Sequence, residues 1–173
     1  MGIVLKTPRL SLRNLDPEDS GFLVELMNEP PYIEHIGDRG VRTAADGRRY
    51  IEEKYAASYA RHGYGLYLVE RVEGAEPIGI CGLVRRESLD HPDLGFAFLH
   101  RYGSRGYARE AAGATLGHAW ETLKLPYVYG LVSPGNLKSI RLLECLGFSP
   151  LRSLAVAGQP FESRLFGKEL KPA

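Results

Sequence analysis

The second half of the chain contains a strand, a helix and another strand in direct succession, and this order constrains the fold more than any other feature. The strand pattern at 94–99 is followed by a glycine-containing loop, a helical pattern at 105–123 and a β-branched and aromatic run at 127–132. Two strands joined through a helix in this way run parallel. Because strand patterns at 66–72 and 77–84 precede this unit as a meander, the sequence predicts a mixed α/β fold with a mostly antiparallel sheet and flanking helices.

Helix caps and periodicity predict the other segments. Asp16 is a good helix N-cap and Pro17 suits the first helical position, so a helix is expected to begin here and to end before Pro30 and Pro31. Residues 32–42 have no clear period and are expected to form a loop. The remaining predicted elements are a first strand at 10–15, a helix from Thr43 to Gly63, a helix at 136–146 and a terminal hairpin with strands at 152–156 and 161–166. No linker-like stretch interrupts the chain, so a single domain over 1–173 is expected.

Composition argues against several classes of function. Twenty-two Lys and Arg against 21 Asp and Glu give a net charge of +1, which argues against a nucleic-acid partner. The sequence has no run of 18 apolar residues and no signal-peptide pattern, so we expect no membrane partner and a cytoplasmic location. The five histidines are scattered and are not paired with cysteine, which argues against a bound metal. Cys81 and Cys145 lie within apolar runs and are expected to be buried free thiols.

The segment at 102–110, where a loop leads into the helical pattern, has the composition of an anion-binding site. Gly106 and Ala108 remove side-chain bulk at a helix start, where backbone N–H groups are free and the helix dipole is positive. Arg101 and Arg105 add local positive charge. The same residues also suit a flexible helix entry that binds nothing, and the motif by itself does not decide between the two interpretations.

Asn136 and Ser139 lie at the start of the next predicted helix. Asn136 is a good N-cap, and Ser139 at the third helical position suits a simple capping arrangement. Capping and a chemical role are compatible, so both alternatives stay open.

Five ordered blocks of the sequence are similar to those of a known enzyme family. The blocks span 7–13, 78–83, 94–99, 105–111 and 136–148. With these blocks the chain resembles the GNAT superfamily of acetyl-CoA-dependent N-acetyltransferases, in particular the branch of ribosomal-protein N-alpha-acetyltransferases. The resemblance covers nearly the whole chain. It implies that the two parallel strands splay apart and that the intervening gap accepts coenzyme A.

The resemblance also implies which residues bind acetyl-CoA. The strand at 96–98 would offer backbone groups to the pantetheine arm, and the loop at 104–108 would hold the pyrophosphate through its amides. Asn136 matches a residue that contacts the pantetheine arm, and Ser139 matches one near the thiol sulfur. The implied cofactor-binding residues are Phe96, Ala97, Phe98, Ser104, Arg105, Gly106, Tyr107, Ala108, Asn136 and Ser139.

The reaction implied by the resemblance is direct attack of a primary amine on acetyl-CoA in a ternary complex. Leu143 occupies a position where many members carry a tyrosine that protonates the departing thiolate, and leucine cannot donate a proton. Ser139, an ordered water or bulk solvent must then take this role, and Ser139 is the favoured candidate for the catalytic acid. Asp93 is the candidate general base, ahead of the other candidates Glu70, Glu87, Asp90 and His100.

Substrate recognition is expected in loops over the cofactor cleft. Tyr32 and Arg39 are the candidate substrate-binding residues, and the same regions contain Asp38, Arg42, Gln159, Phe161 and Glu162. The favoured acceptor is a peptide or protein N-terminus. The alternatives are a small amine, such as an amino acid, a polyamine or an aminoglycoside, and a non-catalytic acyl-CoA-binding module. A homodimer is compatible with the sequence.

Overall fold

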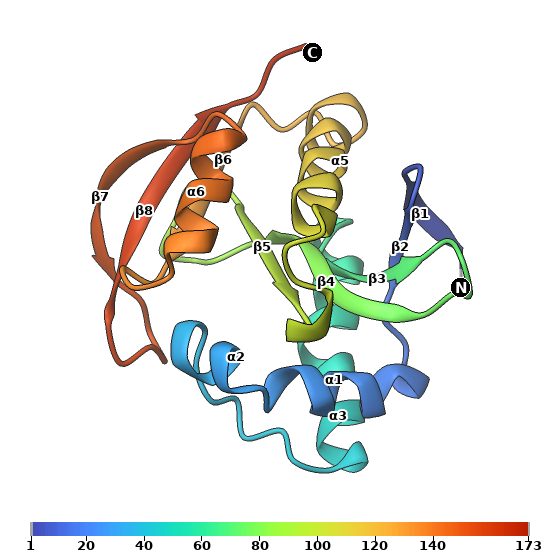
Figure 1. Cartoon of the computed structure of the whole chain (residues 1–173). Helices are drawn as coiled ribbons and strands as arrows, with labels where there is room; N and C mark the ends of the chain where they lie inside the picture. Colours follow the sequence, from blue (N-terminus) through green and yellow to red (C-terminus); the bar gives the residue numbers. More distant parts are fainter. Residues whose placement is uncertain (1, 173) are drawn as a thin grey trace.

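The computed structural model describes residues 2–172 and places eight strands of this part of the chain in one sheet (Figure 1). The strands follow the order β1-β2-β3-β4-β5-β6-β8-β7, and every neighbouring pair is antiparallel except β5 and β6. The strands are β1 (Ile3–Lys6), β2 (Leu10–Asn14), β3 (Leu66–Arg71), β4 (Pro77–Val84), β5 (Asp93–Phe98), β6 (Tyr127–Val132), β7 (Ser149–Ala155) and β8 (Glu162–Glu169). The predicted mixed, mostly antiparallel sheet with one parallel pair is confirmed.

The helices form two groups around this sheet. Figure 1 shows α5 and α6 beside each other in the upper half, whereas α1, α2 and α3 gather below the strands. The helical elements are η1 (Pro17–Asp19), α1 (Ser20–Met27), α2 (Pro30–His35), α3 (Ala44–Tyr50), the π-helical turn η2 (Ile51–Ala56), α4 (Ala57–His62), η3 (His100–Tyr102), α5 (Tyr107–Glu121) and α6 (Leu137–Cys145). Among residues 2–172, no helix combines the length and apolarity needed to cross a bilayer.

Small side chains let α5 lie close to the sheet. Ala111, Ala112 and Ala119 are fully buried, and Thr115 Oγ1 lies 3.5 Å from the Cys81 sulfur of β4. Close packing of this kind fixes the helix against the strands, because dense interiors resist displacement. The start of α5 is therefore held in a defined place relative to the end of β5.

The parallel strands β5 and β6 meet at only one end. Asp93 is paired with Tyr129 and Leu94 with Gly130, while residues 95–98 of β5 have no β6 partner in the described part of the chain. On its other side β5 is paired with β4 along its full length, up to Phe98. The splayed pair implied by the resemblance is thus present, and one edge of β5 is left without a neighbouring strand.

Two predictions for the first 42 residues differ from the structure. The short strand β1 was not predicted, because its four residues form only one edge of a hairpin. Residues 32–42 were predicted as a loop, but α2 covers their beginning. The helix after Asp16 ends at Met27, before Pro30 and Pro31 as predicted. These prolines then form the first turn of α2, where a missing N–H costs nothing because first-turn amides have no helical partner anyway. The cap at Asp16, whose side chain accepts from Glu18 N at 2.8 Å, is confirmed.

The predicted helix from Thr43 to Gly63 is confirmed in its ends and revised in its middle. Thr43 Oγ1 accepts from Asp46 N at 3.1 Å, and Gly63 ends the helix with a left-handed φ of 77°. Between these ends, η2 widens the helix into a π turn.

The prediction that both cysteines are buried is wrong for Cys145, which is exposed in the last turn of α6, whereas Cys81 is buried as expected.

Candidate active site

A cavity of about 840 Å³ opens where β5 and β6 part. Its walls come from α2, from η2 and α4, from the ends of β4, β5 and β6, from the first turns of α6 and from the loop between β7 and β8. Of the residues predicted from the sequence, the cavity brings together Tyr32, Arg39, Asp93, Phe96, Ala97, Asn136 and Ser139. These residues come from four segments, namely α2, the loop after it, β5 and the start of α6, so only the fold makes them neighbours.

The loop before α5 lies outside the cavity lining and has its own geometry. Ser104 and Gly106 adopt left-handed backbone angles, with φ of 60° and 79°. The first hydrogen bond of α5 runs from Glu110 N to the Gly106 carbonyl, and Gly106 carries no capping side chain. Within residues 2–172 the amides of Tyr107 and Ala108 therefore have no partner, and they form the kind of N-terminus that binds anions.

Arg9 holds this loop from the other end of the chain. Its Nη1 donates to the Arg105 carbonyl at 2.9 Å, and its Nε forms an ion pair with Glu110 Oε2 at 2.7 Å. The guanidinium also stacks 4.5 Å above the ring of Tyr107. Thr7 Oγ1 donates to the other Glu110 oxygen at 2.6 Å. Burial opposes ionisation of Glu110, but the bonds from Thr7 and Arg9 outweigh it and lower its pKa.

These positioning roles of Thr7 and Arg9 were not predicted. The only signal for them in the sequence is the block at 7–13, which is one of the five that resemble the family. The contacts themselves join residues about 100 positions apart, and no local pattern encodes them.

Asp93 begins β5 and is almost fully buried. Its Oδ1 accepts from Arg86 Nε at 2.9 Å, and both residues line the cavity. Burial raises the pKa of the Asp93 carboxyl, although the positive charge of Arg86 opposes this shift. Arg86 was not predicted as a site residue, and its only signal is its place in the turn before β5.

Asn136 and Ser139 begin α6 at the opposite wall. Asn136 Oδ1 accepts from Ser139 N at 3.2 Å, so the capping interpretation is confirmed for Asn136. The Ser139 hydroxyl makes no hydrogen bond within the described residues and is available to the cavity. Leu143, one turn further along, is buried against Gly130 of β6 and also lines the cavity.

The other candidate bases lie outside the cavity lining. Glu70 is paired with Arg13 at 2.9 Å, and Asp90 accepts from the Tyr129 hydroxyl at 2.6 Å. Glu87 and His100 are exposed. The pairing of Asp90 lowers its pKa. Asp93 is therefore the carboxylate among these candidates that the fold places at the cavity.

The predicted recognition loops are divided between the cavity and the surface. Asp38 and Gln159 line the cavity, but Arg42, Phe161 and Glu162 do not. Asp38 Oδ2 is held by Arg42 at 2.6 Å. Sequence reasoning missed His35, which lines the cavity and whose Nδ1 lies 3.1 Å from Ser133 Oγ. No group of three or more potential metal-ligating side chains occurs among residues 2–172.

Comparison with known proteins gives consistent matches. A sequence model of the acetyltransferase (GNAT) domain matches residues 9–149. An uncharacterized Bacillus subtilis protein, YkkB, is 26% identical over 159 residues, covering 90% of this chain and 91% of the relative. The crystal structure of an acetyltransferase from Agrobacterium tumefaciens is 28% identical with a TM-score of 0.80, covering 98% of this chain and 95% of that one. A ribosomal alpha-N-protein acetyltransferase, RimL, in complex with coenzyme A, has a TM-score of 0.82 at 14% identity over 98% of both chains, which shows a shared fold.

Proposed function

The chain belongs to the GNAT acetyltransferase family, and from this premise we propose that it transfers an acetyl group from acetyl-CoA to a primary amine by direct attack in a ternary complex. The observation that carries the proposal is the parting of β5 from β6 beside the cavity. The backbone of residues 95–98 has no strand partner on that side, and buried backbone groups need partners. A pantetheine arm, which is rich in amides, suits this edge as an added strand would.

The residues of the α5 loop suit the pyrophosphate of coenzyme A. The amides of Tyr107 and Ala108 are free, and the dipole of α5 adds partial positive charge at the same end. Ser104, Arg105 and Gly106 complete the turn, and the bond from Arg9 to the Arg105 carbonyl keeps it in place. Asn136, with Phe96 and Ala97, lines the cavity on the path that we propose for the pantetheine arm.

The protein must transfer protons and orient the amine toward the thioester, because acetyl-CoA already supplies an activated acetyl group. We propose that Asp93, through a water molecule, takes a proton from the acceptor ammonium and frees its lone pair to attack the carbonyl carbon. A backbone N–H of β5 donates to the carbonyl oxygen as negative charge grows there. As the C–N bond forms and the C–S bond breaks, the nitrogen loses its second proton to water, the Ser139 hydroxyl gives its proton to the departing thiolate, and solvent returns a proton to Ser139.

The favoured acceptor is a peptide or protein N-terminus. Tyr32, Arg39 and Gln159 line the part of the cavity that we assign to it. A small amine is the alternative acceptor. A non-catalytic acyl-CoA-binding module is a second candidate function, and the observation that favours it is Leu143, which occupies the cavity wall without a proton to give.

Calorimetric titration with acetyl-CoA, followed by thiol release with a panel of peptides and amines, tests the proposal. Binding with acceptor-dependent thiol release is the expected result. Binding without release across the panel would favour the non-catalytic candidate, and absence of binding would contradict both.

Asp93→Asn is expected to lower kcat/KM by about 100-fold, because a positioned general base contributes roughly 10²–10⁴-fold. Asparagine keeps an oxygen for Arg86 but accepts no proton. The wild-type rate should rise as the pH passes upward through the raised pKa of Asp93, and this rise should be absent from the variant. The measurement is kcat/KM against pH for both proteins. An unchanged pH profile in the variant would exclude Asp93 as the base.

Ser139→Ala is expected to lower kcat about 10- to 100-fold while the Kd for acetyl-CoA stays within about twofold. The backbone N–H of residue 139, which bonds to Asn136, remains in the variant, so α6 keeps its cap. Single-turnover thiol release and calorimetry measure the two quantities separately. If turnover is intact, thiolate protonation is not a task of Ser139.

A further inference from the structure

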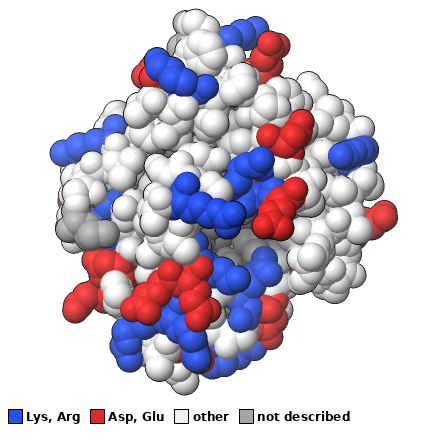
Figure 2. All heavy atoms as spheres, turned by 180° about the vertical axis from the view of Figure 1, so that it is seen from behind, with Lys and Arg blue, Asp and Glu red and all other residues white. Residues whose placement is uncertain are grey.

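Positive side chains outnumber negative ones along the cavity wall. Figure 2 shows Lys and Arg side chains gathered around a hollow on the face opposite to that of Figure 1. The cations that line the cavity are Arg39, Lys54, Arg61, Arg85 and Arg86. The lining acids are Asp38, Glu53 and Asp93, of which Asp93 is paired with Arg86 and Asp38 with Arg42 outside the lining. Four cations then face one remaining carboxylate.

Arg39 is the lining cation with a buried nitrogen that lacks a hydrogen-bond partner among the described residues. Within residues 2–172 no carboxylate lies within 4.0 Å of its guanidinium, and its Nε is buried without a hydrogen-bond partner. Its Nη2 makes only a long contact of 3.5 Å with the Ile36 carbonyl. Its Nη1 lies beside Gly158, at the tip of the loop between β7 and β8. Residues from two segments far apart in the sequence, Ile36 and Gly158, thus lie next to this guanidinium.

The aromatic side chains around Arg39 supply no negative charge. Tyr32, Tyr50 and Tyr55 surround it, and burial raises the pKa of all three phenols, that of Tyr32 to about 12. These hydroxyls are therefore neutral near pH 7. A partly buried charge with only neutral partners is unfavourable, and an incoming carboxylate would relieve it through paired N–H···O bonds.

We propose that Arg39 binds a carboxylate carried by the acceptor, so that the substrate is an amine that also bears an acidic group. This proposal rests on the proposed function and narrows it, because it disfavours polyamines. The phosphates of coenzyme A are not the expected partner, since the α5 loop assigned to them does not line this cavity. The carboxylate can belong to a free amino acid or to an acidic residue near a peptide N-terminus. Both sources present the same group, a carboxylate, to the guanidinium of Arg39.

Two matched acceptor pairs test the proposal. The first compares seryl-aspartyl with seryl-asparaginyl peptides, both amidated at the C-terminus, and the second compares free amino acids with their amides. The wild-type protein should prefer the acidic member of at least one pair by about 10- to 100-fold in kcat/KM, the range expected for a charge-assisted hydrogen bond. Arg39→Gln should bring this ratio close to one, and Arg39→Lys should restore part of it. Arg48→Gln removes an exposed arginine outside the cavity lining and should leave the ratio unchanged.

A binding measurement separates this proposal from the proposed function. The N-acetylated acidic peptide, used as a product-like probe, should bind wild type and Arg48→Gln equally and Arg39→Gln at least about 10-fold more weakly. If no acceptor is acetylated but the probe still binds in an Arg39-dependent manner, the carboxylate site stands and the transferase proposal fails. If acetylation occurs without preference for acidic acceptors, or if Arg39→Gln keeps the preference, the carboxylate site is wrong.

Discussion

Ala108→Trp is expected to weaken acetyl-CoA binding at least about 100-fold. Phosphate oxygens must come within roughly 2.9 Å of the free amides at the start of α5, and only a small residue in this first turn permits that approach. Hydrogen bonds to charged groups contribute about 1.5–3 kcal/mol each, so the loss of two of them accounts for the expected factor. Calorimetric titration with acetyl-CoA measures the change directly.

Gly113→Trp provides the matched control for this prediction. It places the same ring on the same helix, at an exposed position where an added Cβ meets nothing within 4 Å. Its Kd for acetyl-CoA should stay within about threefold of wild type, as expected for a change away from the ligand. Equal binding by Ala108→Trp and wild type would show that the pyrophosphate does not bind at this helix end.

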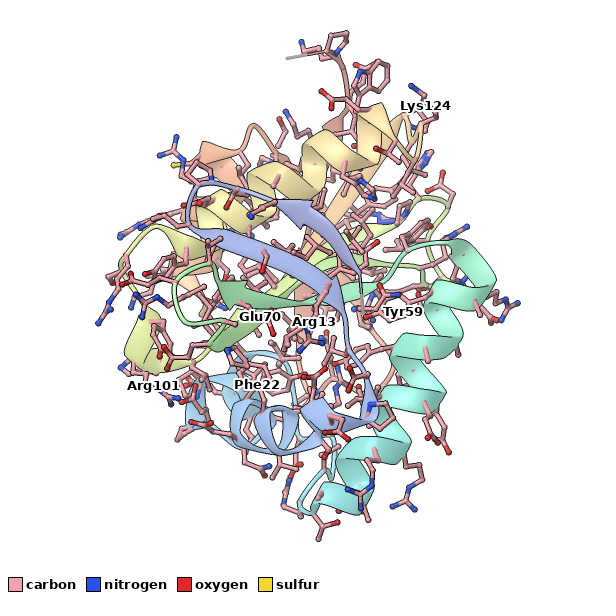
Figure 3. The ribbon with its side chains drawn as sticks, turned by 90° about the vertical axis from the view of Figure 1, so that its right-hand side faces the viewer. Arg13, Phe22, Tyr59, Glu70, Arg101 and Lys124 are labelled. Atoms are coloured by element: carbon pink, nitrogen blue, oxygen red, sulfur yellow. The ribbon has the colours of Figure 1, made fainter. Side chains whose placement is uncertain are left out.

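Arg13→Met is expected to lower the free energy of unfolding by about 3–5 kcal/mol. Arg13 lies on β2 and makes two bonds of 2.9 Å to Asp19 and one of 2.9 Å to Glu70 on β3. The side chains are only 17%, 8% and 14% exposed, in that order. Figure 3 shows Arg13 and Glu70 between the sheet and the helices below it. Methionine would leave two carboxylates facing each other without a cation in a poorly hydrated space.

Denaturant unfolding of Arg13→Met and Arg101→Met compares the stability that a buried ion pair contributes with the stability that an exposed ion pair contributes. Arg101 is paired with Glu25 at the surface, where both side chains are about half exposed, and exposed pairs contribute roughly 0–1 kcal/mol. The midpoint of Arg101→Met should therefore barely move. A loss below about 1 kcal/mol in Arg13→Met would mean that water enters this network and screens it.

Local signals in the sequence were sufficient for most elements. The caps at Asp16, Thr43 and Asn136 are short-range hydrogen bonds between residues two or three positions apart, so the sequence alone predicts them well. Pro30 is ambiguous because proline both follows helices and begins them, and here it begins α2. Cys145 is exposed because it lies two residues beyond Leu143 and so faces away from the side of α6 that buries Ile140 and Leu143, although it stands within an apolar run.

Only those residues of the candidate site that belong to a local motif or to a block resembling the family could be predicted from the sequence. The residues on β5 and at the start of α6 were found in this way, and seven of the predicted residues line one cavity. Arg86 and His35 were not found. His35 depends on Ser133, which is 98 positions away, whereas Arg86 lies only seven positions before Asp93 but in a turn without a motif that marks it. The charge state around Arg39 depends on the burial of tyrosines that no spacing rule brings together.

The contact of Arg9 with the α5 loop also affects the order in which parts of the chain can fold during synthesis. Arg9 and Glu110 are separated by 101 positions, so during synthesis the N-terminal hairpin emerges long before its partner. At about 5–20 residues per second, roughly 5 to 20 seconds pass before the two can meet. Closing so long a loop is also entropically unfavourable. The contact that fixes the α5 loop therefore forms only after residue 110 has emerged, and the cavity residues between Leu131 and Gln159 follow later still, so both parts of the candidate site are completed near the end of synthesis.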